Sequence, residues 1–262
     1  MAALAGRVLA IGGSDPSGGA GIQADLKTIA AFGAYGATAI TALTVQDTRA
    51  VTDVIVLPPG FVAGQIAAVL GDIGADAIKT GMLADPDVVE AVCDALAAGP
   101  RAALVVDPVL RATAGRALLA EAALAVLKRR LLPMAALLTP NLPEAEVLAG
   151  MAIPGLPAMH HAAEVLLTLG VPAVLLKGGH LPGDTVVDLL ATEDGVEAFS
   201  APRLVSRHTH GTGCTLGSAI AAGLAQGASL RDAVLRARAF VRAAIVTAPG
   251  LGAGNGPLNH AV

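Results

Sequence analysis

The sequence predicts an α/β protein built on a mostly parallel sheet with helices on both faces. Short runs rich in Val, Ile and Leu alternate with alanine-rich runs long enough for helices, as in repeated strand–helix–strand units. Apolar residues make up 54% of the 262 residues and charged residues 15%, so the chain can bury a large core. We find no internal repeat, charged tail or Ser/Gly-rich linker, and residues 1–262 are expected to form one domain.

Each element follows from the local pattern. The expected strands are Arg7–Ile11, Ala37–Leu43, Val54–Leu57, Ala77–Lys79, Ala103–Val106, Ala135–Leu138 and Ala173–Leu176. The helices between them are expected at Ile22–Phe32, Gly60–Gly71, Pro86–Ala98, Ala117–Leu131, Pro143–Ala149 and His160–Leu169. Two further runs, Thr185–Ala191 and Val196–Ala201, flank a Glu-Asp-Gly turn and indicate an antiparallel hairpin. The last helices are expected at Cys214–Gln226 and Leu230–Val246.

Composition excludes several classes of protein. The net charge of -4, the absence of Trp and the scarcity of Tyr and Phe argue against nucleic-acid binding, which needs basic surface or stacking platforms. Glycines interrupt the uncharged run Thr28–Gln46 as a helix-to-strand junction would, so we expect no membrane span. Met1–Ala10 reaches a glycine turn too early for a secretory signal, and two cysteines make no disulfide framework. A cytoplasmic location is expected.

The most distinctive local pattern is His208–Cys214, which precedes an apolar helix. Glycines at a helix start let several backbone N–H groups face one point, where the helix dipole also favours negative charge. Gly211, Thr212 and Gly213 therefore form a candidate anion hole with the Cys214 thiol at its edge. Two other interpretations stay open: a plain helix start with an inert cysteine, and a zinc site that includes two histidines of this segment. Zinc is the weaker of the two, because the chain has only one other cysteine.

A second glycine cluster, Gly12–Gly21, follows the first strand. Within it, Gly19–Ala24 matches the G-x-G-x-x-A pattern of dinucleotide-binding proteins. The strand ends well before Gly19, however, and no acidic residue closes a second strand at the spacing of roughly 20 residues. A loop that closes over a small substrate is the better interpretation. Asp25, one turn into the next helix, is then either a dipole-stabilised surface carboxylate or a hydrogen-bond acceptor for that substrate.

Charged residues come directly after three of the predicted strands. Asp107 and Glu144 follow two of them, and Lys177 ends another. Ligands gather at the carboxyl ends of strands in open α/β sheets, so these side chains are expected to converge. Two carboxylates suit magnesium bridged to phosphates, and the lysine can bind a phosphate. Each alone could equally be a helix cap or a solvated charge. The motifs of P-loop proteins, protein kinases and esterases do not occur.

Several motifs occur in a fixed order along nearly the whole chain: Gly12–Asp25, Ala42–Gln46, Lys79–Leu83, Val106–Val109, Thr139–Glu144, Lys177–His180 and Gly211–Cys214. Together they closely resemble the hydroxymethylpyrimidine/phosphomethylpyrimidine kinases of thiamine biosynthesis, in the ribokinase-like superfamily. The resemblance implies a three-layer α/β/α sandwich with a mostly parallel central sheet. It also implies transfer of the γ-phosphoryl group of ATP to 4-amino-5-hydroxymethyl-2-methylpyrimidine, and then to its monophosphate.

The resemblance assigns the phosphoryl cradle to Gly211, Thr212 and Gly213 and the general base to Cys214, where most sugar kinases of the superfamily have an aspartate. A free thiol has a pKa of about 8.5, and a helix N-terminus is expected to lower that of Cys214 to within a unit or two of neutrality. The cysteine thiolate would then accept the proton of the substrate hydroxyl.

The resemblance also assigns the two ligands. For the pyrimidine, Gln46 offers one acceptor and two donors to an aminopyrimidine edge, Met82 contacts the flat ring unless it only fills the core, and Gly13 and Asp25 lie near the hydroxymethyl group. The remaining assignments are nucleotide binding by Asn141, Lys177 and Arg238, and magnesium binding by Asp107 and Glu144. A homodimer is common in the family and is expected here.

Three residues depart from the family pattern. Asp47 stands where asparagine is frequent, Arg111 where a small or apolar residue is common, and Arg238 where lysine is frequent. The nearest alternative is a pyridoxal or pyridoxine kinase of the same superfamily, whose substrate also carries a hydroxymethyl group on a heteroaromatic ring. A non-catalytic pyrimidine sensor is a second alternative.

Overall fold

The computed structural model describes residues 5–110 and 118–262. The position of Arg111 and the expected helix start at Ala117 lie outside the described residues. Among these residues, no helix is both long enough and apolar enough to cross a lipid bilayer.

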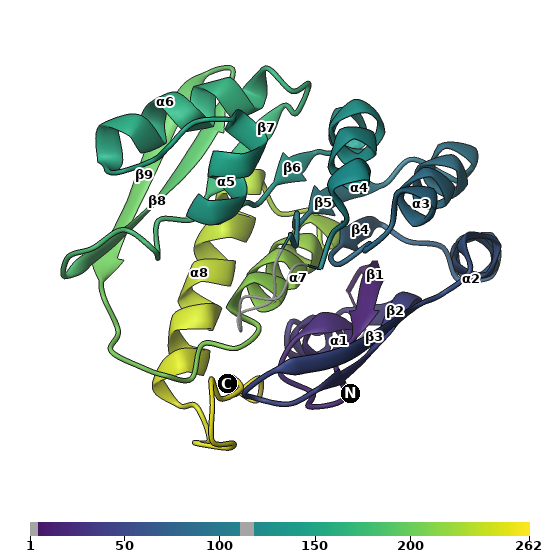
Figure 1. The fold of residues 1–262 in the computed structure, drawn as a ribbon, viewed down its shortest axis with the longest axis horizontal. Coiled ribbons are helices and arrows are strands. Elements are labelled where there is room, and N and C mark those ends of the chain that lie inside the picture. The colour runs from purple at the N-terminus through teal and green to yellow at the C-terminus, as the bar shows by residue number, and fades with distance from the viewer. Residues whose placement is uncertain (1–4, 111–117) are drawn as a thin grey trace.

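In the described residues nine strands form one sheet, in the order β3-β2-β1-β4-β5-β6-β7-β8-β9 (Figure 1). Their bounds are β1 Arg7–Ser14, β2 Tyr35–Gln46, β3 Val51–Val56, β4 Ala77–Thr80, β5 Ala103–Val106, β6 Leu137–Leu138, β7 Ala173–Leu176, β8 Thr185–Thr192 and β9 Gly195–Pro202. The six strands from β2 to β7 in this order pair in parallel. Only β3 at one edge and β8 and β9 at the other are antiparallel, which confirms the mostly parallel sheet.

The helices form a layer on each face of this sheet (Figure 1). Their bounds are α1 Gly21–Ala31, α2 Pro59–Asp72, α3 Pro86–Ala98, α4 Glu121–Val126, α5 Leu142–Ala149, α6 Leu156–Leu167, α7 Thr212–Ala225 and α8 Leu230–Val246. Side chains of α2 to α6 share one apolar core with the sheet, and side chains of α1, α7 and α8 share the other. Along β1, Leu9 and Ile11 enter the first core and Val8 and Ala10 the second, so the segment Val8–Ile11 is apolar on both faces of the sheet. The three-layer architecture is thus confirmed.

Most expected elements are present, and the differences lie at their ends. The helix expected over Ala117–Leu131 is a short α4 followed by a π-helical turn at Leu127–Leu131. Helix α6 begins at Leu156, before the expected His160, because its proline lies in the first turn, where its missing N–H costs no hydrogen bond. The hairpin of β8 and β9 is confirmed, with Thr192 opposite Gly195.

Candidate active site

One cavity of about 610 Å³ opens at the carboxyl ends of the parallel strands and at the start of α7. It is bordered by every residue that the sequence analysis placed in the site, namely Gly13, Asp25, Gln46, Met82, Asp107, Asn141, Glu144, Lys177, Gly211, Thr212, Gly213, Cys214 and Arg238. Asp47 is not among the lining residues; it is exposed and bonds to Arg49 at 2.8 Å.

The start of α7 has the geometry of an anion hole. Gly211 is the residue before the helix and has φ 83°, a left-handed conformation that favours glycine, and a Cβ there would collide with the carbonyl oxygen of Gly19. The N–H of Thr212 bonds back to Thr209 at 3.3 Å, and that of Thr215 bonds to Gly211. Within the described residues, the amides of Gly213 and Cys214 have no hydrogen-bond partner, so the helix start can receive an anion.

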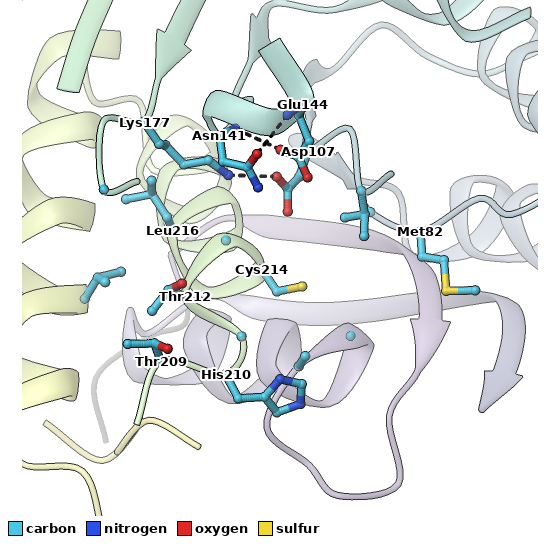
Figure 2. Close-up of a pocket in the computed structure, with 18 of the residues that line it drawn as sticks. Met82, Asp107, Asn141, Glu144, Lys177, Thr209, His210, Thr212, Cys214 and Leu216 are labelled. Carbon is cyan, nitrogen blue, oxygen red and sulfur yellow. Dashed lines mark hydrogen bonds and ion pairs between the residues drawn. The ribbon is translucent and has the colours of Figure 1, made fainter. Parts of the chain in front are cut away.

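The sulfur of Cys214 faces the cavity beside this helix start (Figure 2). Burial raises the pKa of the thiol to about 11; Lys79 opposes this shift, and the carboxylates of Asp25 and Asp107 add to it. The expectation of a thiol pKa near neutrality is therefore wrong. Position at a helix N-terminus is a local feature, and here it is outweighed by burial near two negative charges.

Across the cavity, a lysine and an aspartate from two strand ends form an ion pair (Figure 2). Asp107 follows β5 and Lys177 follows β7, and Lys177 Nζ lies 3.1 Å from Asp107 Oδ1. Burial alone would lower the pKa of Lys177, but Asp107 and Glu144 raise it above its ordinary value, which keeps the ammonium charged. A Cβ added to Gly213 would lie 3.3 Å from Asp107 Oδ2 and 3.4 Å from Lys177 Nζ. The pair and the anion hole therefore share one corner.

Glu144 and Asn141 cap the first turn of α5. Asn141 Oδ1 accepts from the Glu144 amide at 2.9 Å, and Glu144 Oε2 accepts from the Asn141 amide at 2.8 Å, which makes a capping box. The cap function that the sequence left open is thus present, and Glu144 also borders the cavity. Burial raises the pKa of the Glu144 carboxyl above its usual range, with Lys177 opposing and nearby Asp107 reinforcing that rise.

A buried lysine that the sequence analysis did not single out is part of the cavity wall. Lys79 is the penultimate residue of β4 and is 1% exposed, and its Nζ lies 2.9 and 3.1 Å from the two oxygens of Asp25. Ser218 Oγ donates to Asp25 Oδ1 at 2.7 Å. Asp25 therefore borders the cavity while its oxygens already hold two partners. The signal for Lys79 was the one used for Lys177, a lysine at the end of an apolar strand.

The glycine-rich loop after β1 is organised by Asp15. Its carboxylate accepts from the Ser17 amide at 2.8 Å, and from the Ser17 hydroxyl and the Ala20 amide at 2.9 Å each. His210 Nε2 lies 2.8 Å from Asp15 Oδ2, so the loop is joined to the residue that precedes the anion hole. The sequence analysis missed this pair, because its members are 195 positions apart.

The side chains expected to bind the pyrimidine line the opposite wall. Gln46 ends β2, and its Nε2 lies 3.3 Å from His210 Nε2. Met82 follows β4, is 8% exposed and faces Gly13, where an added Cβ would lie 3.0 Å from Met82 Sδ. Gly13 therefore lets the strand approach the methionine, and the two residues form an apolar part of the cavity wall.

Arg238 reaches the cavity from α8, but two of its nitrogens have protein partners. Nε donates to Asp188 Oδ2 at 2.8 Å and an Nη donates to the Phe199 carbonyl at 2.8 Å. The guanidinium carbon also lies 5.4 Å from the centre of the Phe199 ring. These contacts hold α8 against β8 and β9 and fix the arginine at the cavity edge.

Comparison with known proteins identifies the family. The family model described as phosphomethylpyrimidine kinase matches residues 15–259. The chain belongs to this family. The hydroxymethylpyrimidine/phosphomethylpyrimidine kinase of Rhizobium meliloti is 48% identical, over 96% of each chain. The thiamine biosynthesis bifunctional protein ThiED of Geobacter sulfurreducens is 49% identical over 97% of this chain, which spans about half (52%) of that longer relative.

Solved structures of the same fold agree. The ADP complex of Bacillus subtilis pyridoxal kinase superposes with a TM-score of 0.90 at 34% identity, over 98% of this chain and 97% of that one. This agreement confirms the ribokinase-like architecture that the sequence motifs implied. Similar folds of one superfamily hold different substrates, so the substrate has to be argued from the site.

Proposed function

We propose that this chain is the ATP-dependent kinase that phosphorylates 4-amino-5-hydroxymethyl-2-methylpyrimidine to its monophosphate and then to its diphosphate, in thiamine biosynthesis. The observation that carries the proposal is the composition of one cavity wall. The cavity joins the free amides at the start of α7 and the Cys214 thiol to a polar and apolar wall made by Gln46 and Met82. Membership of the phosphomethylpyrimidine kinase family supports the same reaction, and kinases of this kind use ATP.

The transferred phosphoryl group is held by the start of α7. In a loose transition state, charge spreads over the three equatorial oxygens, and the protein contributes mainly alignment and charge stabilisation. The amides of Gly213 and Cys214, with the α7 dipole behind them, are fixed donors for those oxygens. Lys177 adds a buried positive charge at the same corner and binds the phosphates of the nucleotide.

The substrate hydroxyl loses its proton to Cys214. With a thiol pKa of about 11, the thiolate is a minor species at neutral pH, and the buried ammonium of Lys79 is the neighbouring charge that favours it. In a loose transition state the bond from the attacking oxygen is barely formed, so that oxygen needs little negative charge. A minor population of thiolate is therefore sufficient. Gly211 and Thr212 hold the cysteine at the cavity edge by fixing the first turn of α7.

Asp107 and Glu144 fit a magnesium site. Both offer hard oxygens, and Asp107 Oδ2 faces the anion hole. No group of three His, Cys, Asp or Glu side chains gathers as a metal cage within the part of the chain that the structure describes. A site of two carboxylates completed by water and phosphate oxygens is the usual arrangement for this ion. When bound, magnesium would neutralise phosphate charge on the nucleotide.

The pyrimidine ring lies against Met82 and Gly13, with its polar edge toward Gln46 and its hydroxymethyl group toward Asp25 and Cys214. On the opposite wall the nucleotide contacts Lys177, Asn141 and Arg238. These assignments place donor and acceptor on the two sides of the anion hole, as in-line transfer requires.

Three wider properties belong to the proposal. Residues 1–262 act as one kinase domain, supported by the single sheet of the described residues. The protein works in the cytoplasm, supported by two free cysteines. It forms a homodimer, supported by exposed apolar side chains on one face of β2 and β3, where Leu43 pairs with Ile55 and Val45 lies two residues farther along β2.

Pyridoxal kinase activity is the second candidate. It is favoured by the TM-score of 0.90 to the Bacillus subtilis pyridoxal kinase, and pyridoxal presents the same hydroxymethyl group on a six-membered ring. Gln46 is better matched to an aminopyrimidine edge, which offers an acceptor beside a donor. We therefore expect pyridoxal to be the poorer substrate.

The test is a direct assay. Purified protein is mixed with magnesium and ATP and with either the aminopyrimidine alcohol or pyridoxal, and the products are resolved by mass. We expect mono- and then diphosphorylated pyrimidine. The matched control is Cys93→Ala, which changes a buried cysteine outside the cavity lining and is expected to keep activity. Phosphorylation of pyridoxal alone, or ATP-independent binding without product, would contradict the proposal and support one of the two alternatives.

A further inference from the structure

The side chains of Asp15, His210 and Gln46 meet in a chain of hydrogen bonds at the substrate wall. His210 Nε2 lies 2.8 Å from Asp15 Oδ2 and 3.3 Å from the amide nitrogen of Gln46. The same imidazole nitrogen thus faces both a carboxylate and an amide NH₂ group. One nitrogen cannot donate its proton to the first and also accept a hydrogen bond from the second.

Asp15 decides which role His210 takes. Its Oδ2 is already approached by two donors, the Ser17 hydroxyl and the Ala20 amide, and its Oδ1 by the Ser17 amide. Burial by itself would raise the pKa of Asp15, but the hydrogen bonds from His210 and Ser17 bring it below its ordinary value. Asp15 is therefore an ionised acceptor, and His210 Nε2 carries the proton that it donates to Asp15.

With a proton on His210 Nε2, an amide NH₂ of Gln46 at 3.3 Å would place donor against donor. A half-turn of the Gln46 amide removes the conflict. The oxygen then faces the Nε2–H of His210, which it shares with Asp15 in a three-centre hydrogen bond. The nitrogen takes the present position of Oε1, 3.2 Å from Thr44 Oγ1. Thr44 Oγ1 donates to the Ser14 carbonyl at 2.9 Å, so its lone pairs can accept from that nitrogen. Amide oxygen and nitrogen are interchangeable in shape, and the hydrogen-bond network decides between them.

We propose that the Asp15–His210 pair fixes the Gln46 amide with its oxygen toward His210, and so sets the polarity of the edge that reads the substrate ring. His210 is in this view a positioning residue that determines specificity. The proposal rests on the proposed pyrimidine kinase function. It adds a role for a histidine and an aspartate that lie outside the catalytic assignments.

The fixed polarity has a chemical consequence. After one hydrogen bond to His210 and one to Thr44, Gln46 keeps one N–H and one oxygen lone pair for the ligand. These match the ring nitrogen, an acceptor, and the adjacent amino group, a donor, of a 4-aminopyrimidine. Because the hydroxymethyl group must face Cys214, the ring cannot turn over to suit a reversed amide. A hydroxypyridine such as pyridoxal depends less on the amide direction, since its hydroxyl group can donate or accept.

The experiment measures kcat and KM for the aminopyrimidine alcohol and for pyridoxal at saturating ATP, with calorimetric binding of the pyrimidine as a second readout. His210→Leu removes the donor at similar size. We expect it to raise the pyrimidine KM and Kd about tenfold, as for one unpaired buried polar group, and to change kcat and the pyridoxal KM much less. His210→Gln keeps an N–H for Asp15 and for Gln46, and is expected to recover most of the pyrimidine affinity.

Two further variants serve as controls. His161→Leu changes an exposed histidine on α6 and is expected to behave as the wild type. Gln46→Glu keeps an acceptor toward His210 but has no N–H for the ring, so it is expected to fold with an unchanged melting temperature and to lose pyrimidine binding. Circular dichroism melting of each variant shows whether it is folded.

The outcomes separate the two proposals. Equal loss of pyrimidine and pyridoxal affinity in His210→Leu, or no recovery in His210→Gln, would overturn the positioning role while wild-type activity upholds the kinase. If the wild type does not phosphorylate the pyrimidine, the proposed function fails, and calorimetry still reports on His210. Absence of pyrimidine binding by the wild type would overturn both.

Discussion

The thiol of Cys214 lies where a helix dipole favours negative charge, yet its surroundings oppose ionisation. Burial, reinforced by two nearby carboxylates, raises its pKa to about 11, whereas Lys79 and the amide of Gly21 act in the other direction. A cysteine can accept the substrate proton only when it is a thiolate, and the thiolate fraction grows with pH. The residue that removes the proton therefore leaves a signature in the pH dependence of turnover.

We expect Cys214→Ala to lower kcat about a hundredfold. This is at the low end of the usual effect of removing a general base, because the transition state is loose. Pyrimidine binding should change little. In the wild type kcat should rise as the pH is raised above neutrality, and in Cys214→Asp this rise should flatten because a carboxylate ionises at lower pH. Steady-state kinetics from pH 6 to 10 measure both effects; near-wild-type turnover of Cys214→Ala would remove Cys214 from the role of base.

At the residue scale, sequence reasoning succeeded where a chemical group follows a strand or starts a helix. Asp107, Lys177 and the Gly211–Cys214 segment all border one cavity, as the strand-end argument predicted. The hydrogen-bond partners could not be predicted in the same way. Asp15 and His210 are joined only by the folded structure, and the thiol pKa of Cys214 depends on charges contributed by distant elements.

At the scale of elements, the buried ion pair of Lys79 and Asp25 joins strand β4 to helix α1, and Ser218 brings in α7. Both charged side chains are 1% exposed. A buried pair of this kind costs desolvation energy when formed, but removal of one partner leaves the other charge buried and unpaired. The three elements are therefore expected to respond together to a change at either residue.

Lys79→Met is expected to destabilise the fold by about 3 to 5 kcal/mol, because it leaves the Asp25 carboxylate without its counter-charge. The double variant Lys79→Met with Asp25→Leu should recover much of this loss, since no buried charge then remains unpaired. Urea denaturation followed by circular dichroism gives the free energy of unfolding for each. Strict additivity of the two single changes would show that the pair is not coupled.

The element boundaries show what periodicity alone can and cannot predict. Strands such as Ala103–Val106 and Ala173–Leu176 match their expected bounds, because both faces are buried and the run is apolar throughout. The pairing of β3 was not predictable, since its antiparallel register with β2 depends on the turn between them. The π-helical turn after α4 was not predicted either, because a run of five residues is too short for apolar spacing to distinguish i→i+5 from i→i+4 hydrogen bonds.

At the scale of the whole molecule, one face of the β2–β3 ribbon is exposed and carries Leu43, Val45 and Ile55. Val45 is 61% exposed and Ile55 is 62% exposed. Apolar side chains gathered on one face of an edge ribbon are typical of a surface covered by a partner. A second copy of the chain is the partner that the family resemblance implies.

Ile55→Lys is expected to dissociate the proposed homodimer, because a charge at the centre of an apolar contact has to be desolvated. Size-exclusion chromatography with light scattering should give twice the 25.8 kDa chain mass for the wild type and one chain mass for the variant. Val246→Lys, an equally exposed apolar residue on α8, is the control and should stay dimeric. A monomeric wild type would contradict the dimer directly.

The stability of the whole molecule should also depend on pH through His260, near the end of the chain. Its Nε2 lies 2.9 Å from the hydroxyl oxygen of the buried Thr215, and burial together with the charge of Lys27 lowers the pKa of His260 to about 4. The histidine is thus neutral in the folded chain at a pH where the unfolded chain, with an ordinary histidine pKa of about 6.5, binds a proton. Its contribution to stability is complete above pH 6.5 and is lost as the pH falls toward 4, by at most about 1.4 kcal/mol per pH unit.

His260→Gln should weaken this acid sensitivity, because a glutamine amide can hydrogen-bond to the Thr215 hydroxyl without titrating. We expect the free energy of unfolding of the variant to fall less steeply than that of the wild type between pH 6.5 and 4, while the two differ little in slope above pH 7. Denaturant titrations at several pH values measure the slopes, and His161→Gln on the exposed face of α6 is the matched control. If the free energies of unfolding of wild type and His260→Gln fall in parallel across the acid range, the prediction is contradicted. His260 would then already be protonated in the folded chain, or the C-terminal segment would open before the rest of the fold.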